Sequence, residues 1–151
     1  MVDLIIESFK IRKTVYDEGL QALSGLIFGV GKDFAANMEK FFPYLIFSLR
    51  NNEDTTLCRV AVGCVGDLSR ALEDGMAPYL NEVVPILMNM LRNPDTDRSL
   101  KLVSITALGD LAFATHRMFI GYLHDLLEIL KSAAALSLQP IQDVLFIHRL
   151  L

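Results

Sequence analysis

Tryptophan is absent from the 151-residue sequence, and cysteine occurs only twice, as Cys58 and Cys64. Two cysteines do not make the disulfide framework of a small secreted protein, so we expect reduced thiols. Long hydrophobic runs are absent too, because the longest stretch without a charged residue, 19–31, is shorter than the ~18–20 residues that a membrane-spanning helix needs. The sequence also begins without a secretory signal, and we expect no membrane partner.

Basic residues are in short supply. Lys and Arg number 14 against 18 Asp and Glu, which gives a net charge of −4. Nucleic-acid binders normally carry a basic stripe, so we expect no nucleic-acid partner. The acidic excess is concentrated in residues 51–100, which hold four basic and eight acidic side chains.

Apolar residues make up 52% of the chain, and their pattern repeats every 42 to 43 residues. The copies begin at Phe34, Met76 and Phe119, and each has apolar side chains at offsets 0, 4, 7, 8 and 11. That spacing follows one face of an α-helix. A repeat of this length is typical of stacked helical hairpins, in which each unit buries its apolar face against the next.

Other residues keep the same step. Pro85 follows Pro43 by 42 residues, and the triplet Gly-Asp-Leu at 66–68 returns at 109–111, with a weaker copy at Gly25. The sequence therefore predicts an all-α solenoid of about three and a half helical hairpins, forming one array over 1–151. We expect the hairpins at approximately 1–31, 32–73, 74–116 and 117–151. The helices are expected near 2–12, 15–30, 34–50, 54–72, 76–92, 98–115, 118–132 and 140–151.

Several residues within this pattern have a predicted structural role. Asp54 and Asp97 stand where they can cap the following helices by accepting from free backbone N–H groups. The two prolines fall inside helices, which they should kink. Glycine inside a helix costs ~1 kcal/mol relative to alanine. We therefore expect the backbone of a neighbouring helix to come close to Gly25, Gly66 and Gly109.

The positions of the chain ends within the repeat carry a further expectation. When the spacing between the proline and the Gly-Asp-Leu triplet is extended beyond the first and last copies, both ends of the sequence fall inside helices. We therefore expect a piece of a longer solenoid, whose uncapped ends promote self-association.

The sequence contains no motif for catalysis or metal binding with the residue spacing that such a site requires. The segment 29–33, Gly-Val-Gly-Lys-Asp, has Leu26 and Asp33 where a phosphate-binding loop needs glycine and Ser or Thr. The two cysteines lack zinc-site spacing, and the three histidines form no metal-binding pair. We expect no catalytic residue, no metal and no cofactor, and hence no enzyme. The histidines are His116, His124 and His148.

The stretch Val60–Leu72, with the sequence VAVGCVGDLSRAL, resembles the importin beta family, the nuclear-import karyopherins built from HEAT repeats. The resemblance extends over 17–49 and 76–130, including VSITALGDLA at 103–112. It is to the C-terminal half of that long superhelix. From about Ser137 onward we see no resemblance to the family.

The resemblance implies a HEAT-repeat superhelix that acts as a non-catalytic carrier shuttling between cytoplasm and nucleus. Helices 15–30, 54–72 and 98–115 correspond to the inner set, which lines a concave face, and 34–50, 76–92 and 118–132 to the outer set. In the family the inner surface holds a basic helix of importin alpha or other basic cargo. Pairs of outer helices accept the phenylalanines of FG nucleoporins, and Ran-GTP binds mainly to an N-terminal arch that is not represented in this chain.

Acidic residues on the inner helices and their turns are the candidates for basic cargo, since opposite charges steer association and strengthen hydrogen bonds. For Asp67 and Asp110 an alternative stays open, namely that they bond locally between repeats. The candidate cargo-binding residues are Glu18, Asp67, Glu73, Asp74 and Asp110.

Apolar residues off the main stripe of the outer helices are the candidates for FG nucleoporins, because methionine-rich surfaces suit weak binding of inserted aromatic rings. Burial of the same residues against the next repeat is the alternative. These candidates are Ile46, Phe47, Met88 and Met90.

Two other functions compete with transport. A HEAT-repeat scaffold subunit of another assembly, of the phosphatase or condensin type, would share the fold without affinity for basic import signals. A small helical enzyme would need His116 or His124 buried in a pocket beside a carboxylate.

Overall fold

The computed structural model of the chain describes the backbone at residues 2–11, 16–51 and 53–150, and the side chains at 3–9, 16–51 and 53–135. Within these ranges the chain is helical apart from short turns, and it contains no strand. The all-α prediction is confirmed. The chain divides into two units, Met1–Ile120 and Gly121–Leu151.

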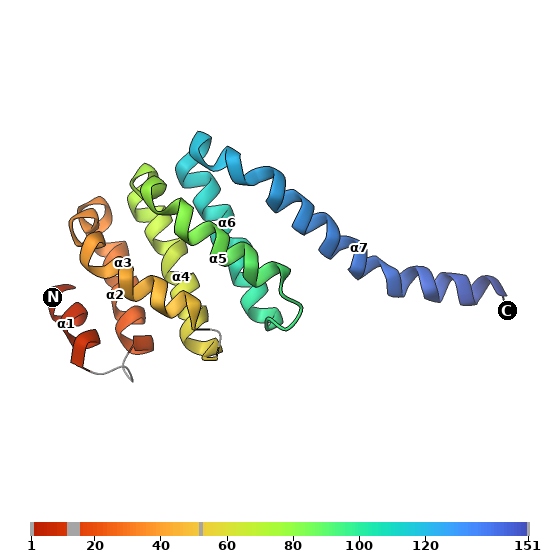
Figure 1. Cartoon of the computed structure of the whole chain (residues 1–151), viewed down its shortest axis with the longest axis horizontal. Helices are drawn as coiled ribbons and strands as arrows, with labels where there is room; N and C mark the ends of the chain where they lie inside the picture. Colours follow the sequence, from red (N-terminus) through yellow and green to blue (C-terminus); the bar gives the residue numbers. More distant parts are fainter. Residues whose placement is uncertain (1, 12–15, 52, 151) are drawn as a thin grey trace. The chain divides into compact units, whose positions relative to one another are not determined.

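The first unit is a succession of helices that run back and forth (Figure 1). They are α1 (Val2–Ile11), α2 (Tyr16–Val30), α3 (Met38–Arg50), α4 (Thr55–Leu72), α5 (Leu80–Arg92) and α6 (Arg98–Thr115). Three 3₁₀ segments follow α2, α4 and α6: η2 (Gly31–Asn37), η3 (Glu73–Tyr79) and η4 (His116–Phe119). The second unit consists of helix α7 (Ile120–Leu150).

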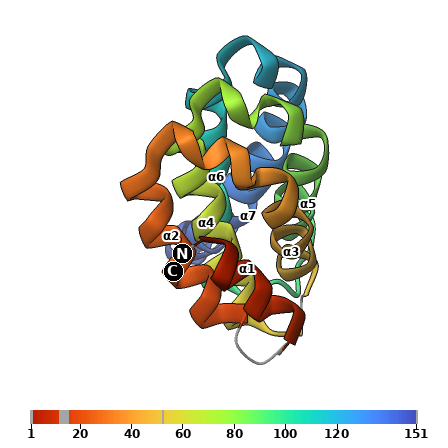
Figure 2. The same cartoon turned by 90° about the vertical axis from the view of Figure 1, so that its left-hand side faces the viewer.

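The helices of the first unit form two layers, seen end-on in Figure 2. Helices α2, α4 and α6, the expected inner set, pack side by side in what we call the B layer, and α1, α3 and α5 form the A layer. Neighbouring B helices run parallel in a fixed register. The Cys64 thiol donates to the carbonyl of Leu20, which lies 44 residues earlier in the chain. The Ser24 hydroxyl donates to Asp67, which lies 43 residues later. The repeat of the sequence is therefore also the repeat of the packing.

The predicted apolar stripes form the core between the layers. Fully burying a Leu, Phe or Met side chain stabilises the fold by roughly 1.5–3 kcal/mol. In the third stripe, which belongs to α7, Leu123 and Leu127 are partly exposed. The buried members of the first two stripes are Phe34, Met38, Phe41, Leu45, Leu49, Met76, Leu80, Val83, Val84 and Leu87.

The A-to-B turns follow the predicted capping chemistry. The Asp54 carboxylate accepts from the backbone N–H of Leu57 at 3.0 Å, and Asp97 accepts from that of Ser99 at 2.8 Å. The capping predictions are confirmed. Pro43 and Pro85 are each the sixth residue of their helix, so they occupy equivalent positions in successive repeats.

The B-to-A turns differ from the prediction because no linker separates the helices. Each B helix ends at a residue with positive φ, namely Gly31 (61°), Glu73 (51°) and His116 (46°). The chain then enters a 3₁₀ segment, whose i→i+3 bonds make a tighter turn than an α-helix. As a result α3, α5 and α7 begin at Met38, Leu80 and Ile120, later than predicted. Positive φ suits glycine, whereas Glu and His hold it at a cost of ~1–3 kcal/mol.

Helix α7 continues through the break that we predicted between residues 132 and 140. The prediction of two helices, 118–132 and 140–151, is therefore wrong. Residues 133–135 are three alanines, the strongest helix formers, and the stretch up to Pro140 contains neither Gly nor Asn to end a helix.

Close approach at the repeated glycines is also mostly wrong. A Cβ atom added at Gly25 or Gly109 would meet nothing within 4 Å, and one at Gly66 would lie 2.8 Å from the Asp110 carboxylate rather than near a helix backbone. The tight contact that the sequence did not reveal is at Gly19. A Cβ there would overlap the buried Phe9 ring, which packs between Tyr16 and Tyr44 with centroid distances of 5.2 Å to both.

We predict that Gly19→Ala lowers the free energy of unfolding by about 1–3 kcal/mol, because Phe9 has no free space into which it could move. The matched control is Gly25→Ala in the same helix, which should raise that free energy by up to ~1 kcal/mol. Denaturant unfolding followed by circular dichroism measures both. Equal effects at the two glycines would show that Phe9 does not press on α2.

Candidate functional site

Two acidic residues of the B layer, Asp67 and Asp110, are joined by a chain of side-chain hydrogen bonds. Asp67 of α4 accepts from Ser24 of α2 and, at 2.8 Å, from Arg70. Arg70 also donates to Asp110 of α6 at 2.6 Å. One guanidinium thus connects carboxylates of two successive repeats, and hydrogen bonding to Asp67 raises the pKa of Arg70. We call this chain of four residues the B-layer ladder.

The ladder explains the glycine that precedes the aspartate in the repeat. Gly66 lies one turn before Arg70, and any side chain there would collide with the Asp110 carboxylate. Glycine at this position therefore makes room for a charged pair. Gly109 occupies the equivalent position in α6, where no side chain enters the space.

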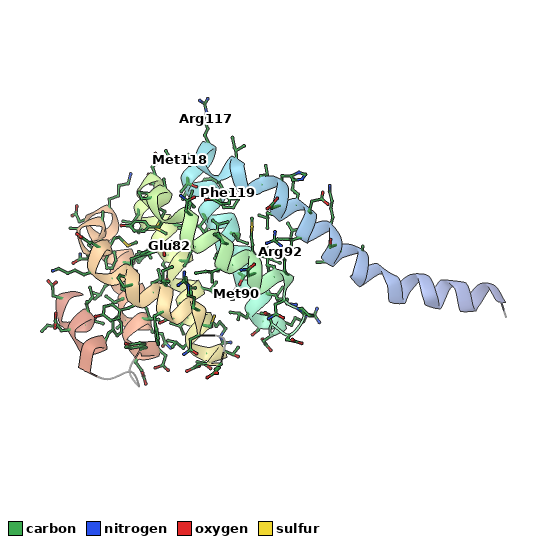
Figure 3. All side chains as sticks on the ribbon, in the orientation of Figure 1. Glu82, Met90, Arg92, Arg117, Met118 and Phe119 are labelled. Carbon is green, nitrogen blue, oxygen red and sulfur yellow. The ribbon has the colours of Figure 1, made fainter. Side chains whose placement is uncertain are left out.

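Three of the five predicted cargo-binding acids line one cleft of about 360 Å³ at the C-terminal ends of α4 and α6. They are Glu73, Asp74 and Asp110, and the wall is completed by Ser69, Arg70, Phe113, Ala114 and His116. Phe113 is 81% exposed and its ring meets that of His116 at a centroid distance of 6.0 Å. We call this the acidic cleft. Among the residues that line this cleft, Arg70 is the only arginine or lysine. Arg117, which follows His116, points away from the helices (Figure 3).

The cleft acids are engaged to different degrees. Glu73 pairs with Lys32 of the preceding turn at 2.7 Å, an exposed contact that raises the pKa of Lys32, with a smaller contribution from the charge of Asp74. Asp110 is held by Arg70, whereas Asp74 is exposed. Exposed ion pairs are worth only ~0–1 kcal/mol, so a cationic ligand can compete for Glu73 and Asp74.

The remaining two acids lie elsewhere. Asp67 belongs to the ladder rather than to the cleft wall. Both Asp67 and Asp110 bond to residues of neighbouring helices in this structure, as in the alternative of local bonding between repeats. Glu18 is exposed near the start of α2, in an earlier turn than Ser24. The structure therefore does not bring Glu18 together with the others.

Two grooves on the described part of the A layer contain residues that were predicted to bind FG nucleoporins. A groove of about 460 Å³ on α3 is lined by Ile46 and Phe47 together with Pro43, Arg50 and Asn51. Phe47 is 45% exposed and packs edge-on against Tyr16 at a centroid distance of 5.5 Å.

Ile46, Met88 and Met90 follow the alternative that we gave for them, namely burial in the fold. All three are buried, because α3 and α5 pack on their neighbours over a wider face than the main stripe. Ile46 and Met90 still line grooves, whereas Met88 is not among the lining residues of any groove described here.

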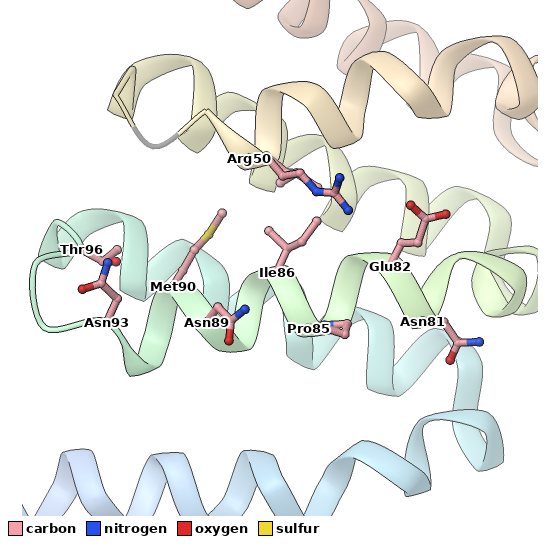
Figure 4. Close-up of a pocket in the computed structure, with 10 residues that line it drawn as sticks. Arg50, Asn81, Glu82, Pro85, Ile86, Asn89, Met90, Asn93 and Thr96 are labelled. Carbon is pink, nitrogen blue, oxygen red and sulfur yellow. The ribbon is translucent and has the colours of Figure 1, made fainter.

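The second groove, of about 470 Å³, lies between α3 and α5, and Met90 is the one lining residue that sequence reasoning had named. From α5, Glu82, Ile86 and Met90 point toward Arg50 of α3 (Figure 4). Its wall combines apolar side chains, asparagine side chains of α5 and the following turn, and the charged side chains Arg50 and Glu82. Arg50 is shared by both A-layer grooves. The groove is lined by Leu49, Arg50, Asn81, Glu82, Pro85, Ile86, Asn89, Met90, Asn93 and Thr96.

The cysteines are buried, whereas the histidines whose side chains are described are exposed, with His116 at the wall of the acidic cleft. Cys58 and Cys64 are buried free thiols, and this burial raises the pKa of Cys58 to about 11 and that of Cys64 to about 12. His116 and His124 are exposed, and the side chain of His148 lies outside the described residues. Among the side chains that are described, no group of three His, Cys, Asp or Glu could hold a metal ion. No helix in the described part of the chain is long and apolar enough to cross a membrane.

Comparison with known proteins separates the candidate scaffolds. The family described as importin subunit beta-1-like, TPR repeats, matches residues 2–148. The chain belongs to the importin beta family. Importin subunit beta-1 of Arabidopsis thaliana is 36% identical over 138 residues, covering 91% of this chain and 16% of its own length. That of Saccharomyces cerevisiae is 33% identical over 119 residues, covering 79% and 14%.

Solved importin beta structures share the fold. A crystal structure of importin beta in an ammonium sulfate condition superposes with a TM-score of 0.82 at 28% identity, covering 88% of this chain and 16% of that one. A structure in which Kap95p binding induces the switch loops of RanGDP to adopt the GTP-bound conformation gives 0.70 at 31% identity, covering 78% and 14%. The chain thus spans about one sixth of these importin beta proteins.

Two details follow from the match. TPR repeats have a period of 34 residues and HEAT repeats one of ≈ 40–47, so the 42 to 43 residues seen here are the HEAT length. The family match also runs to residue 148, so our expectation that the resemblance ends near Ser137 is wrong. Membership of the importin beta family favours the transport hypothesis over a phosphatase or condensin scaffold.

We predict that the ladder contributes modestly to stability. Asp110→Asn should lower the free energy of unfolding by about 0.5–1 kcal/mol, a small loss because Arg70 is 58% exposed to water. Asp74→Asn, in the same cleft, should change it by less than that. A double-mutant cycle of Asp110→Asn with Arg70→Gln, followed by denaturant unfolding, isolates the pair. A coupling energy of zero would mean that Asp110 is free for other partners.

Proposed function

We propose that the chain is a non-catalytic binding segment of a nuclear transport receptor of the importin beta family. Its B layer holds a basic partner, such as the basic helix of importin alpha or another basic cargo, and its A layer contacts FG nucleoporins. Such a receptor shuttles between cytoplasm and nucleus. Ran-GTP binding, which we place mainly on other repeats of the full-length receptor, is not assigned to any residue here.

The acidic cleft carries this proposal. It sets Glu73, Asp74 and Asp110 around a concave surface, with the exposed Phe113 ring on the same wall. A Lys or Arg side chain entering the cleft would gain charge-assisted hydrogen bonds from carboxylates and a cation–π contact from the ring. Asp67 and Glu18 add negative potential along the same layer and steer a basic partner toward it.

Removing two charges from the cleft tests the proposal. A labelled basic helical peptide, measured by fluorescence anisotropy at low ionic strength, should bind the Glu73→Gln/Asp74→Asn variant roughly tenfold more weakly, which corresponds to ~1.4 kcal/mol. Because the attraction is electrostatic, added salt should weaken binding to the unchanged chain.

The matched control is Glu53→Gln/Asp95→Asn, which removes two exposed turn acids at the opposite ends of the helices. This variant carries the same net charge and should retain nearly full affinity. If both variants lose affinity equally, only the net charge attracts the peptide. If the unchanged chain does not bind at low salt, the cargo proposal fails.

The A-layer site for FG nucleoporins is proposed at the groove of Ile46 and Phe47 and the neighbouring groove that contains Met90. Met88 is left out because it is buried and lines neither of these grooves, whereas Ile46 and Met90 line them. The half-exposed Phe47 ring supports this site, since aromatic rings pair edge-on or offset with a contribution of ~0.5–1.5 kcal/mol beyond burial.

We predict that Phe47→Asp weakens binding of an FG-repeat peptide by roughly tenfold, measured by chemical-shift titration. Phe28→Asp is the control, because Phe28 is an exposed phenylalanine of the B layer. Loss of binding in the control, with Phe47→Asp unaffected, would place the FG site on the other layer.

A further inference from the structure

The acidic cleft contains a cation that belongs to the chain itself. Arg70 lines the cleft, and its guanidinium donates to Asp110 at 2.6 Å and to Asp67 at 2.8 Å. The carboxylate that a cationic ligand would meet on the α6 wall is therefore already engaged. A ligand can bond to Asp110 only beside Arg70 or in its place.

The exposure of Arg70 does not depend on where the chain begins or ends, because α4 has α2 on one side and α6 on the other. The Arg70 side chain is 58% exposed, whereas those of Asp110 and Asp67 are 23% and 28% exposed. Ion pairs in contact with water are held weakly. Arg70 can therefore exchange places with another cation while α4 stays packed between its neighbours.

The position between the two carboxylates has the shape of a guanidinium. Arg70 uses Nη1 toward Asp110 and Nη2 toward Asp67, so one planar group bridges two helices. An ammonium group is a point charge and lacks this fixed fork of donors. Gly66 keeps the position open, because a Cβ there would lie 2.8 Å from the Asp110 carboxylate and 3.4 Å from the Arg70 guanidinium.

A second acid of the cleft is engaged in a similar way. Lys32 of η2 pairs with Glu73 of η3 at 2.7 Å, and both side chains are largely exposed. Each of the two pairs joins a cation of one repeat to an acid of the next. The chain thus supplies its own cations to two of the three acids that line the cleft, and Asp74 is the third.

We propose that an arginine of the basic partner takes the place of Arg70 between Asp67 and Asp110, so that Arg70 is a built-in competitor that limits the affinity of the acidic cleft. This inference rests on the proposed function of the cleft. It adds the side chain that the cleft prefers and the residue that opposes its binding. Because Arg70 is tethered beside the two carboxylates, it competes at an effective concentration of roughly millimolar or above.

Fluorescence anisotropy with a labelled oligoarginine peptide tests the competition on the full chain. Arg70→Gln should bind the peptide roughly fivefold more tightly than the unchanged chain, because the competing ion pair is lost. The matched control is Arg59→Gln, which removes an equal charge from an exposed arginine of α4, about 16 Å earlier along the helix. At a salt concentration of about 0.1 M that distance exceeds the Debye length of about 10 Å, so the control should change affinity by less than about twofold. Circular dichroism verifies that each variant is folded.

Two further measurements separate an exchange of arginines from a general gain in negative charge. An oligolysine peptide of the same length should gain less from Arg70→Gln than oligoarginine does, because an ammonium group does not bridge the two carboxylates as a guanidinium does. In nuclear magnetic resonance spectra of the unchanged chain, the Nε–Hε signal of Arg70 is assigned by its absence from Arg70→Gln. That signal should shift as oligoarginine is added, while the signal of Arg59 stays in place.

The remaining outcomes overturn the inference or separate it from the proposed function. Unchanged, weaker or absent binding by Arg70→Gln would mean that Arg70 does not compete for the cleft. Equal gains in Arg70→Gln and Arg59→Gln would leave only net charge, and equal gains for both peptides would contradict the preference for arginine. In each of these cases the cargo proposal stands if Glu73→Gln/Asp74→Asn weakens binding to the otherwise unchanged chain. If that variant has no effect while Arg70→Gln still binds more tightly, the cargo proposal fails and the exchange at Arg70 stands.

Discussion

The packing of one B helix on the next, one repeat further along the chain, is the relation on which the other features of this molecule depend. It places Cys64 against Leu20 and Asp67 against Ser24, and it carries Arg70 across to Asp110. The A helices rest on that layer and bury their apolar stripes against it. Both the charged chain along the B layer and the grooves along the A layer follow from this register.

The same register divides the acidic residues between structure and binding. Asp67 and Asp110 lie at the centre of the layer, where a guanidinium joins them, and Glu73 and Asp74 lie at its edge, where water competes. Charges at the centre hold neighbouring repeats in line, while charges at the edge remain available to a ligand. An acidic surface can therefore serve both the fold and the proposed binding site, with Asp67 in the ladder, Glu73 and Asp74 in the cleft, and Asp110 in both.

Sequence reasoning recovered the features that depend on periodicity. The stripes that begin at Phe34 and Met76 are buried as predicted, because an apolar face with helical spacing has no stable alternative to packing. The caps at Asp54 and Asp97 were predictable from local chemistry. The resemblance of the segment around Val60–Leu72 correctly indicated the family.

Features that depend on three-dimensional neighbours were not recoverable. Whether Met88 and Met90 face water depends on how far α5 is covered, which one helix cannot reveal. The role of Gly66 required knowing that Asp110, 44 residues away, points at it. Only three of the five predicted acids share a cleft, because residues close in repeat position can lie at different heights along a helix.

The sharp corners at Gly31, Glu73 and His116 bear on the elasticity of the array. A single backbone torsion turns the chain at each corner, with no slack segment to act as a hinge. At Gly31 and Glu73, a B helix and the A helix after it can therefore shift only by small sliding of their packed faces. Larger changes of curvature fall to the A-to-B turns, such as residues 93–97, where the chain is not helical.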